Sequence, residues 1–266
     1  MDTRIDFATA EKFNQLELVD WPTKYGHFKF YVRKGLNEVK YNVGTNVTKS
    51  ANSGEYIKPL TSKVYGEVLD VNEILNHEDT WLDVGGHIGL FSIRMATQFP
   101  KIKEVISYEA LPHNVTFANE NIKLNNLVDR CRVVQKAIVP DDSDTIEFFI
   151  AADSGKHSII PTKGRETIQV QATNINNAIA KHQPTAIKMD VEGAEYELIK
   201  AIEDWSNISV LIIEWHFNTK QLSEDRPGKF QEIMDILNAN FDSIRKIENV
   251  EYGKNFITHF VALKNR

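Results

Sequence analysis

The sequence has few of the features that mark secreted or membrane-spanning chains. It contains one cysteine, Cys131, so no disulfide can form within the chain, which is typical of a reducing compartment. The first residues, MDTRIDFATAEKFNQ, lack the apolar core of a secretory signal, and no apolar run approaches the roughly 18 residues that a membrane span needs. These absences predict a cytoplasmic protein with no membrane partner, in which Cys131 is a small buried side chain.

Positive charge is also in deficit. The chain has 31 Lys and Arg against 37 Asp and Glu, a net charge of −6. A general nucleic-acid binder usually carries a basic excess or a basic stripe. The charge balance therefore predicts no nucleic-acid partner. The 266 residues, 42% of them hydrophobic, suffice for one large domain, or for a domain with an extension.

Two regions of the sequence differ in pattern. Residues 1–78 are polar and irregular, with a predicted hairpin of HFKFYVRKG and VKYNVGTNV, a turn-rich stretch at 48–56 and a helical run at 64–76. From 79 to 266 strands alternate with helices, which predicts an α/β domain with a doubly wound, mostly parallel sheet. The last two predicted strands indicate an antiparallel C-terminal edge.

Ligands in such a sheet bind beyond the carboxyl ends of the strands, at the topological switch point. Polar residues that end strands are therefore the candidate site residues. The predicted strands are 80–85, 104–110, 131–138, 145–150, 167–173, 186–191, 210–216, 242–248 and 256–264, and the predicted helices are 89–99, 113–126, 174–182, 193–202 and 228–241.

A glycine-rich loop, DVGGHIG from Asp83 to Gly89, joins the first of these strands to its helix. Glycines permit a tight turn and close approach of a ligand, and the helix N-terminus that follows offers free amide donors. Glu109 ends the next strand, where a carboxylate can accept from both hydroxyls of a ribose. The combination predicts a nucleotide-like cofactor. The spacing lacks the Gly-x-Gly-x-x-Gly of dinucleotide sites, but a nicotinamide-dependent oxidoreductase remains an alternative.

Five segments carry a resemblance to a known family: LDVGGHIGLFSI, YEALPHNVTFANENIKLN, VVQKAIV, IKMDVEGAEYELIKAI and VLIIEWH. In these segments, from about Thr80 to His216, the chain resembles the FkbM family of methyltransferases. The resemblance implies a Rossmann-like fold, S-adenosylmethionine as methyl donor, and O-methylation of a hydroxyl, frequently on a sugar or polyketide. His87 stands where the family usually has Asn. A catalytically inactive cofactor-binding module and a nucleic-acid methyltransferase are the alternatives.

Carried over residue by residue, the resemblance implies a cofactor site. Asp83, Gly85 and Gly89 would line the methionine half, Glu109 would hold the ribose, and the adenine would lie near the end of the third strand. Asn114 is expected to brace the following helix rather than to touch the cofactor. The implied cofactor-binding residues are Asp83, Gly85, His87, Gly89, Glu109, Ala110, Gln135, Ala137 and Asp190.

Polar residues also end the two later core strands: Lys188 and Asp190 on one, Glu214 and His216 on the other. Residues two apart in a strand share a face, so adjacent carboxyl ends would bring the four together beside the methyl donor. Methyl transfer to oxygen needs an aligned acceptor and a base for its proton. His216 has the most suitable intrinsic pKa, and Asp190 or Glu214 would orient it, bind the acceptor or act as base. Lys188 would stabilise an alkoxide or pair with an acid.

Other interpretations of these residues stay open. Asp190 and Glu214, with His216 nearby, could hold a magnesium ion, but we assign no metal ligands from the sequence. Glu192 and Glu195 either join the site or favour the next helix through its dipole. The loop with His157 and Ser158 faces the acceptor or forms a turn. Trp215 is expected in the core, and surface or structural roles are expected for His77, His113, His182 and His259.

The partner implied by the resemblance is a small-molecule or glycan acceptor. Residues 1–78 are expected to shape the acceptor site of the methyltransferase domain at 79–266. Their removal should then spare cofactor affinity and abolish turnover.

Overall fold

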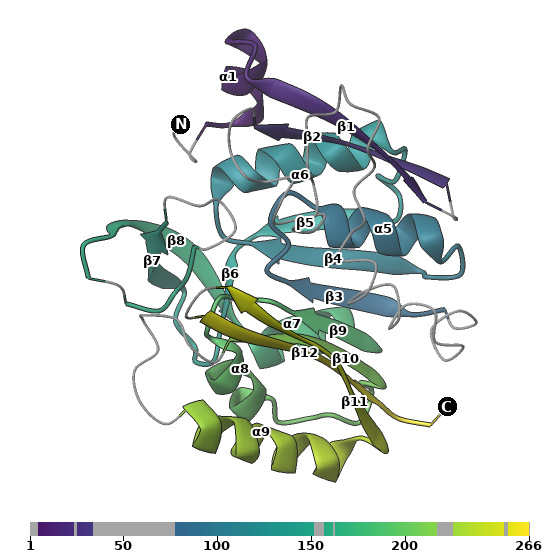
Figure 1. The fold of residues 1–266 in the computed structure, drawn as a ribbon, viewed down its shortest axis with the longest axis vertical. Helices are drawn as coiled ribbons and strands as arrows, with labels where there is room; N and C mark the ends of the chain where they lie inside the picture. Colours follow the sequence, from purple (N-terminus) through teal and green to yellow (C-terminus); the bar gives the residue numbers. More distant parts are fainter. Residues whose placement is uncertain are drawn as a thin grey trace.

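The computed structural model describes residues 5–23, 26–33, 78–151, 157–161, 163–216, 226–252 and 255–265. The predicted strand VKYNVGTNV, the turn-rich stretch at 48–56, the helical run at 64–76 and His77 lie outside the described residues. Figure 1 shows a central sheet with helices on both sides and a separate N-terminal hairpin.

The central sheet has seven strands in the order β11-β12-β10-β9-β3-β4-β5. The five from β5 to β10 are parallel, and β12 runs antiparallel between β10 and β11. This confirms the doubly wound, mostly parallel sheet with an antiparallel C-terminal edge. The strands are β3 (Thr80–Val84), β4 (Glu104–Glu109), β5 (Cys131–Gln135), β9 (Ala186–Met189), β10 (Val210–His216), β11 (Ser243–Tyr252) and β12 (Asn255–Leu263).

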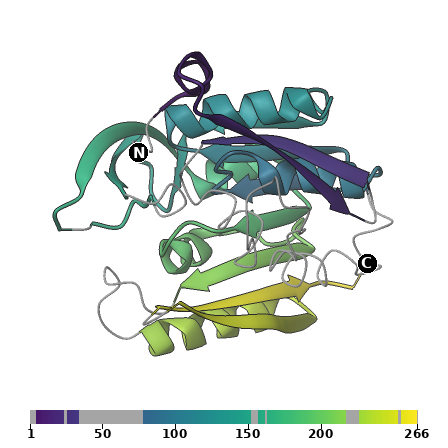
Figure 2. The same cartoon turned by 45° about the horizontal axis from the view of Figure 1, so that its top comes forward.

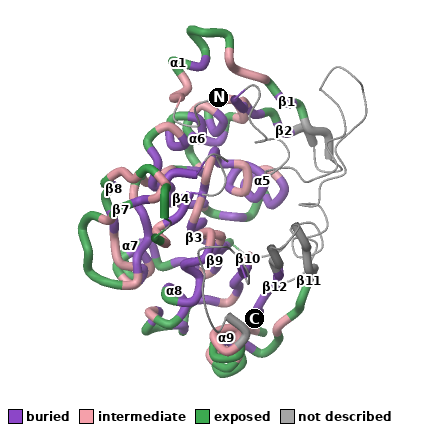
Figure 3. Tube along the Cα trace, turned by 60° about the vertical axis from the view of Figure 1, so that its left-hand side comes forward, coloured by how far each residue is buried: buried purple, intermediate pink, exposed green. Residues whose placement is uncertain are grey.

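Helices cover both faces of this sheet, because its inner strands are apolar on both sides. Leu82, Ile187 and Leu211 belong to a core with α7 (Ile175–His182), α8 (Glu195–Ala201) and α9 (Arg226–Asn240). Their neighbours Trp81, Ala186 and Val210 face the other way, toward α5 (Leu90–Gln98) and α6 (Pro112–Leu124). Figure 3 shows the central strands as a continuous buried trace. Trp215 and Cys131 are buried, as predicted.

The switch point of the sheet lies between β3 and β9. From β3 the chain winds out through β4 to β5 and later returns to β9, on the other side of β3. Val84 and Met189 end these two strands and are register partners. The glycine loop and the residues after Met189 therefore leave the sheet side by side.

The predicted strand 131–138 is two strands. β5 ends at Gln135, and β6 (Ala137–Val139) leaves the main sheet to pair with β8 (Glu166–Asn174) and β7 (Thr145–Ile150), in the order β6-β8-β7. This side sheet has an apolar core of its own, which draws β6 away from the main sheet. The core contains Ala110, Leu111, Ala137, Val139, Phe148, Ile150, Val170 and Ala172.

The N-terminal hairpin differs from the prediction. A short helix, α1 (Phe7–Lys12), precedes β1 (Leu16–Thr23), which pairs antiparallel with β2 (Gly26–Arg33). The segment HFKFYVR is thus a strand as expected, but it is the second strand of the hairpin rather than the first. Figure 2 shows the hairpin lying across α5 and α6. Phe28, Phe30, Val32, Phe117 and Ile88 pack together there.

Among the described helices, none has both the length and the apolar character that crossing a bilayer would require.

Candidate active site

A buried polar row crosses the sheet just below its carboxyl edge. Ser107, Asp83 and Lys188 are register neighbours on β4, β3 and β9. The fully buried Asp83 carboxylate accepts from the hydroxyls of Ser107 (3.2 Å) and Ser92 (2.8 Å), and its Oδ1 lies 3.3 Å from Lys188 Nζ. Lys188 Nζ also donates to the carbonyl of Gly85 at 2.8 Å. The Asp83–Lys188 pair therefore ties the glycine loop to the sheet.

Lys188 remains charged in this surrounding. Burial opposes the charge, but the carboxylates of Asp83 and Asp190 outweigh burial and raise the pKa of the ammonium. Asp190 Oδ2 lies 3.5 Å from Lys188 Nζ. Of the two roles expected for Lys188, pairing with acids is seen, and stabilisation of an alkoxide stays a prediction. Contact of Asp83 with the cofactor also stays a prediction.

The glycines of the loop serve close packing at the switch point. Gly85 has φ +87°, and a Cβ there would lie 1.9 Å from the carbonyl oxygen of Asp190. A Cβ on Gly86 would lie 1.6 Å from Ser107 Oγ. Only glycine lets the loop turn this tightly against β4 and the end of β9.

Glu109 ends β4 with its carboxylate held by three donors. Oε1 accepts from Leu111 N at 2.9 Å and Asn114 Nδ2 at 3.3 Å, and Oε2 accepts from His87 N at 2.9 Å. Burial raises the pKa of Glu109 to about 7 despite these donors. Asn114 thus holds the acid, a contact that was not predicted; the expected bracing of the helix start by Asn114 stays a prediction. His87 contacts Glu109 through its backbone, so this contact does not depend on which side chain stands at residue 87.

The residues expected near the adenine differ in accessibility. Gln135 is exposed and is the register partner of Glu109 at the same edge of the sheet. Ala110 and Ala137 are buried in the core of the side sheet. Gln135 is thus the most accessible of the three to a bound ring.

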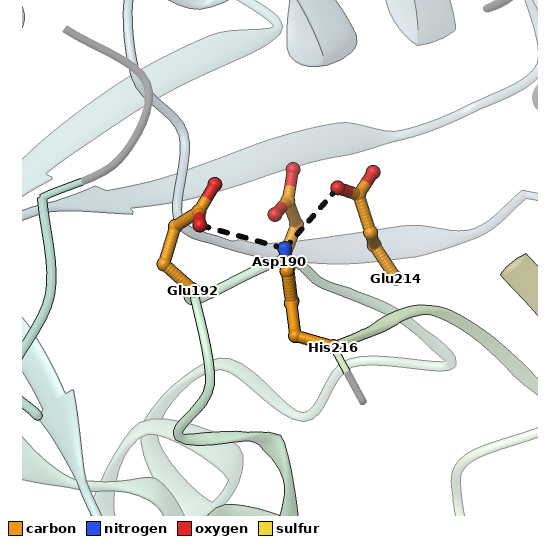
Figure 4. Close-up of side chains that lie close together, drawn as sticks. All are labelled: Asp190, Glu192, Glu214 and His216. Carbon is orange, nitrogen blue, oxygen red and sulfur yellow. Dashed lines mark ion pairs between the residues drawn. The ribbon is translucent and has the colours of Figure 1, made fainter. Parts of the chain in front are cut away.

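Three of the four predicted catalytic residues, Asp190, Glu214 and His216, come together with Glu192 at the carboxyl ends of β9 and β10 (Figure 4). The fourth, Lys188, pairs with Asp190. His216 Nε2 lies 3.4 Å from Glu214 Oε1 and 3.5 Å from Glu192 Oε2. One ligand atom from each of Asp190, Glu192, Glu214 and His216 lies within 4.8 Å of the others. We call these four residues the acid–histidine cluster.

Three contributors were not assigned from the sequence. Glu195, fully buried at the start of α8, accepts from His216 Nδ1 at 2.8 Å and from Gly193 N at 2.8 Å. Glu192 adopts φ +53°, which turns its carboxylate into the cluster. His259 on β12 lies 2.6 Å from Glu214 Oε2 and is the register partner of Glu214. The KMDVEGAE motif already contained both glutamates, but no local pattern pointed to His259.

The charges of the cluster do not favour His216 as a base. Burial alone would lower its pKa, but the carboxylates of Glu192 and Glu195 outweigh burial and hold the pKa of His216 well above its usual value. These carboxylates therefore favour the protonated imidazole, and only 2% of the side chain is exposed. The intrinsic pKa of histidine is therefore no longer a reason to prefer His216 as the base.

The carboxylates of the cluster titrate differently from one another. Burial raises the pKa of Glu192 to about 8, and burial with repulsion from Glu214 raises the pKa of Asp190 to about 6. Burial acts the same way on Glu214, but His259 and His216 outweigh it and hold the pKa of Glu214 well below its usual value.

The acid–histidine cluster also has a donor set that could hold a divalent cation. Asp190 and Glu214, the two ligands considered from the sequence, are joined by Glu192 and His216. Carboxylate oxygens suit Mg²⁺, and a ligating histidine usually donates its second ring N–H to a carboxylate, as His216 does to Glu195.

The loop of the side sheet reaches the cluster through Ser158. Its hydroxyl donates to the carbonyl of Glu192 at 3.0 Å, and its backbone pairs with Phe149. His157 Nδ1 accepts from Ala151 N at 2.9 Å and is buried. Ser158 therefore supports the left-handed turn at Glu192.

Comparison with known proteins gives a family match. The model of the methyltransferase FkbM domain matches residues 83–245. The chain is 20% identical over 168 residues to methyltransferase sdnD of Sordaria araneosa, and 22% identical over 160 residues to Methyltransferase 1 of Beauveria bassiana (strain ARSEF 2860). Each match covers 50% of this chain, and the matches span 64% and 63% of the two relatives, less than two-thirds of their lengths.

Solved structures show more distant likenesses. A putative transferase of Pyrococcus horikoshii is 14% identical, with a TM-score of 0.48 over 94% of this chain and 73% of its own. TYW2 of M. jannaschii, in complex with AdoMet, is 15% identical, with a TM-score of 0.45 over 93% of this chain and 85% of its own. Likenesses of this size carry no inference about what the present chain binds.

The buried pair of Lys188 and Asp83 makes a stability prediction. Lys188→Met should lower the free energy of unfolding by about 3–5 kcal/mol, because it leaves the Asp83 carboxylate buried without its cation. Urea unfolding measures the change. Lys123→Met, at an exposed pair with Glu120, is the matched control and should change it by less than about 0.5 kcal/mol.

Adding Asp83→Leu to Lys188→Met should recover part of the loss, because the Asp83 carboxylate is then no longer buried without its cation. A Lys188→Met variant as stable as the control would show that the pair does not hold the loop.

Proposed function

The chain belongs to the methyltransferase FkbM domain family, and on that premise we propose that it transfers the methyl group of S-adenosylmethionine to a hydroxyl of a sugar, glycan or related metabolite. One observation carries the proposal. The acid–histidine cluster lies at the carboxyl edge of the sheet. Its first residue, Asp190, follows β9, and β9 pairs with β3, the strand that leads into the glycine loop. The groups proposed to bind the acceptor thus lie at the same edge of the sheet as the groups proposed to bind the cofactor.

The residues present fit S-adenosylmethionine, which supplies an electrophilic methyl group on sulfur. A carboxylate oxygen can accept two hydrogen bonds, and Glu109 Oε2 accepts one, from His87, in the described part of the chain. A second acceptor position therefore remains for a ribose hydroxyl. Gln135, exposed beside Glu109, can meet the adenine. Gly85, His87 and Gly89 shape the loop, and their contacts with the cofactor belong to the proposal.

Within the cluster, Asp190 is the proposed proton acceptor. It is the most exposed of the four side chains, at 28%, and it follows directly on β9 beside the glycine loop. In the reaction a carbon–oxygen bond forms, the carbon–sulfur bond breaks, and the hydroxyl proton passes to the Asp190 carboxylate. His216 holds Glu192 and Glu214 in place. Lys188 offsets the charge of Asp190.

The same carboxylates suggest the chemistry of the acceptor. Glu192 and Glu214 are each 19% exposed at the cluster. Glu214, whose pKa is held low, accepts hydrogen bonds as a carboxylate, whereas Glu192, with a pKa of about 8, can also donate one when protonated. A sugar offers adjacent hydroxyl donors to such a surface, whereas an anionic acceptor would be repelled. A neutral polyhydroxylated acceptor is therefore the best match. Residues 1–78 are proposed to extend the domain at 79–266 and to contribute to the acceptor site.

The cofactor assignment predicts pH-dependent binding of S-adenosylhomocysteine. Because the pKa of Glu109 is about 7 and the ionised carboxylate is the stronger acceptor, affinity should rise about tenfold between pH 6 and pH 8. Glu109→Gln should remove this dependence and weaken binding by about 1–3 kcal/mol. Isothermal titration calorimetry measures both, with Glu147→Gln at an exposed position as control.

Absence of binding to the wild-type protein would overturn the methyltransferase proposal. Binding of equal strength at pH 6 and pH 8 would contradict only the role of Glu109 at the ribose, and the methyltransferase proposal would stand.

The assignment of Asp190 predicts a loss of turnover. Asp190→Asn should lower kcat about 100-fold or more, the usual contribution of a general base, with a much smaller change in S-adenosylhomocysteine affinity. Methyl transfer to a panel of neutral mono- and oligosaccharides measures kcat, and Asp144→Asn, at an exposed position, is the control.

Methylation of amines but of no sugar would contradict the hydroxyl acceptor. Turnover abolished by EDTA and restored by Mg²⁺ would make Asp190 a metal ligand instead of the proton acceptor. Cofactor binding with no turnover on any acceptor would favour the inactive module.

A further inference from the structure

We propose that the N-terminal hairpin is a positioning element for the cofactor half of the site. This inference rests on the function proposed above. In it, β2 orients Glu109 and the glycine loop through polar side chains of α6. It assigns to the described part of residues 1–78 a role in cofactor binding, which differs from the expectation from the sequence that removal of residues 1–78 spares cofactor affinity.

The first connection runs from Arg33 to Glu109. Arg33, 1% exposed, lies 4.2 Å over the ring of Phe117, and its guanidinium donates to the carbonyl of Ile5 (2.9 Å) and to Asn114 Oδ1 (3.2 Å). A guanidinium has only donors, so it fixes the oxygen of the Asn114 amide toward itself. The amide nitrogen must then point the other way, where it donates to Glu109 Oε1.

The second connection runs from Tyr31 to the glycine loop. The fully buried Asn121 accepts from Tyr31 N at 2.6 Å and donates to Tyr31 O at 3.2 Å, as a neighbouring strand would. Its amide nitrogen also donates to the carbonyl of Ile88 at 3.0 Å. One side chain thus joins the backbone of β2 to the backbone of the loop. Asn125 makes the same pair of bonds with Lys29, which adds a second rung to the attachment.

These residues lie along one stripe of α6. Asn114, Ala118, Asn121 and Asn125 recur at spacings of three and four residues, so they share a face of the helix. A Cβ on Gly89 would approach Ala118 Cα to 3.3 Å, so the helix packs directly on the loop at that position. The stripe therefore touches β2 on one side and the cofactor loop on the other.

The polar character of this contact argues for positioning rather than for packing alone. Burying amides and a guanidinium is costly unless their hydrogen bonds are made, and apolar side chains of similar size would fill the same space without that cost. Here the buried groups are used to direct a donor at Glu109 and to hold Ile88. His87, through Glu109, and Ile88 are thereby held from outside the central sheet.

The inference predicts the effect of Arg33→Met, which keeps an apolar stem over Phe117 and removes the donors. Affinity for S-adenosylhomocysteine should fall roughly three- to tenfold, the effect of one lost hydrogen bond. The pH midpoint of binding should rise by about half a unit or more, because the freed Asn114 amide no longer holds a donor against the Glu109 carboxylate. Titration calorimetry from pH 5.5 to pH 9 measures both.

Two further variants separate positioning from folding. Arg33→Lys retains a cationic donor and should recover part of the affinity. Asn114→Asp keeps a partner for Arg33 but has no donor for Glu109, so it should weaken binding and raise the midpoint as Arg33→Met does. Lys12→Met, an exposed cation over Phe13, is the control and should change neither. Urea unfolding confirms that each variant is folded during the titrations.

Wild-type binding with an unchanged affinity and midpoint in folded Arg33→Met and Asn114→Asp would overturn this inference and leave the proposed function intact. Failure of the wild-type protein to bind would instead overturn the proposed function on which the inference rests.

Discussion

The site depends on a buried ion pair beneath the switch point of the sheet. Lys188 on β9 and Asp83 on β3 are register partners, so the pairing of the two strands brings the charges together. Lys188 then holds the carbonyl of Gly85 and lies beside Asp190. This one contact therefore fixes the glycine loop against the end of β9. It also places a cation beside Asp190, the first carboxylate of the cluster.

Much of this arrangement was predictable because it follows from short-range patterns. Alternation of apolar strands and helices predicted the parallel sheet, and the carboxyl ends of adjacent parallel strands must meet at one edge. That rule sufficed to bring Lys188, Asp190, Glu214 and His216 together. The sequence placed Asn114 at a helix start, but its bond to Glu109 was not predicted.

The remainder depends on contacts that no local pattern encodes. His259 meets Glu214 only because β12 inserts between β10 and β11, and the register of that insertion is a property of the whole sheet. The protonation of His216 depends on Glu195, which reaches it from the start of α8. The hairpin partner of β2 was missed because LELVDWPT, unlike HFKFYV, has no clean alternation of apolar and polar residues.

The place of β12 has a consequence for the order in which the chain matures. In the sheet as described, β11 pairs with β12 and not with β10, so neither β11 nor the outer side of β10 has a partner until residues 255–263 have left the ribosome. Glu214 likewise gains its histidine neighbour on β12 only then. A nascent chain would thus complete the glycine loop and its contacts with β9 before it completes the surroundings of the acid–histidine cluster.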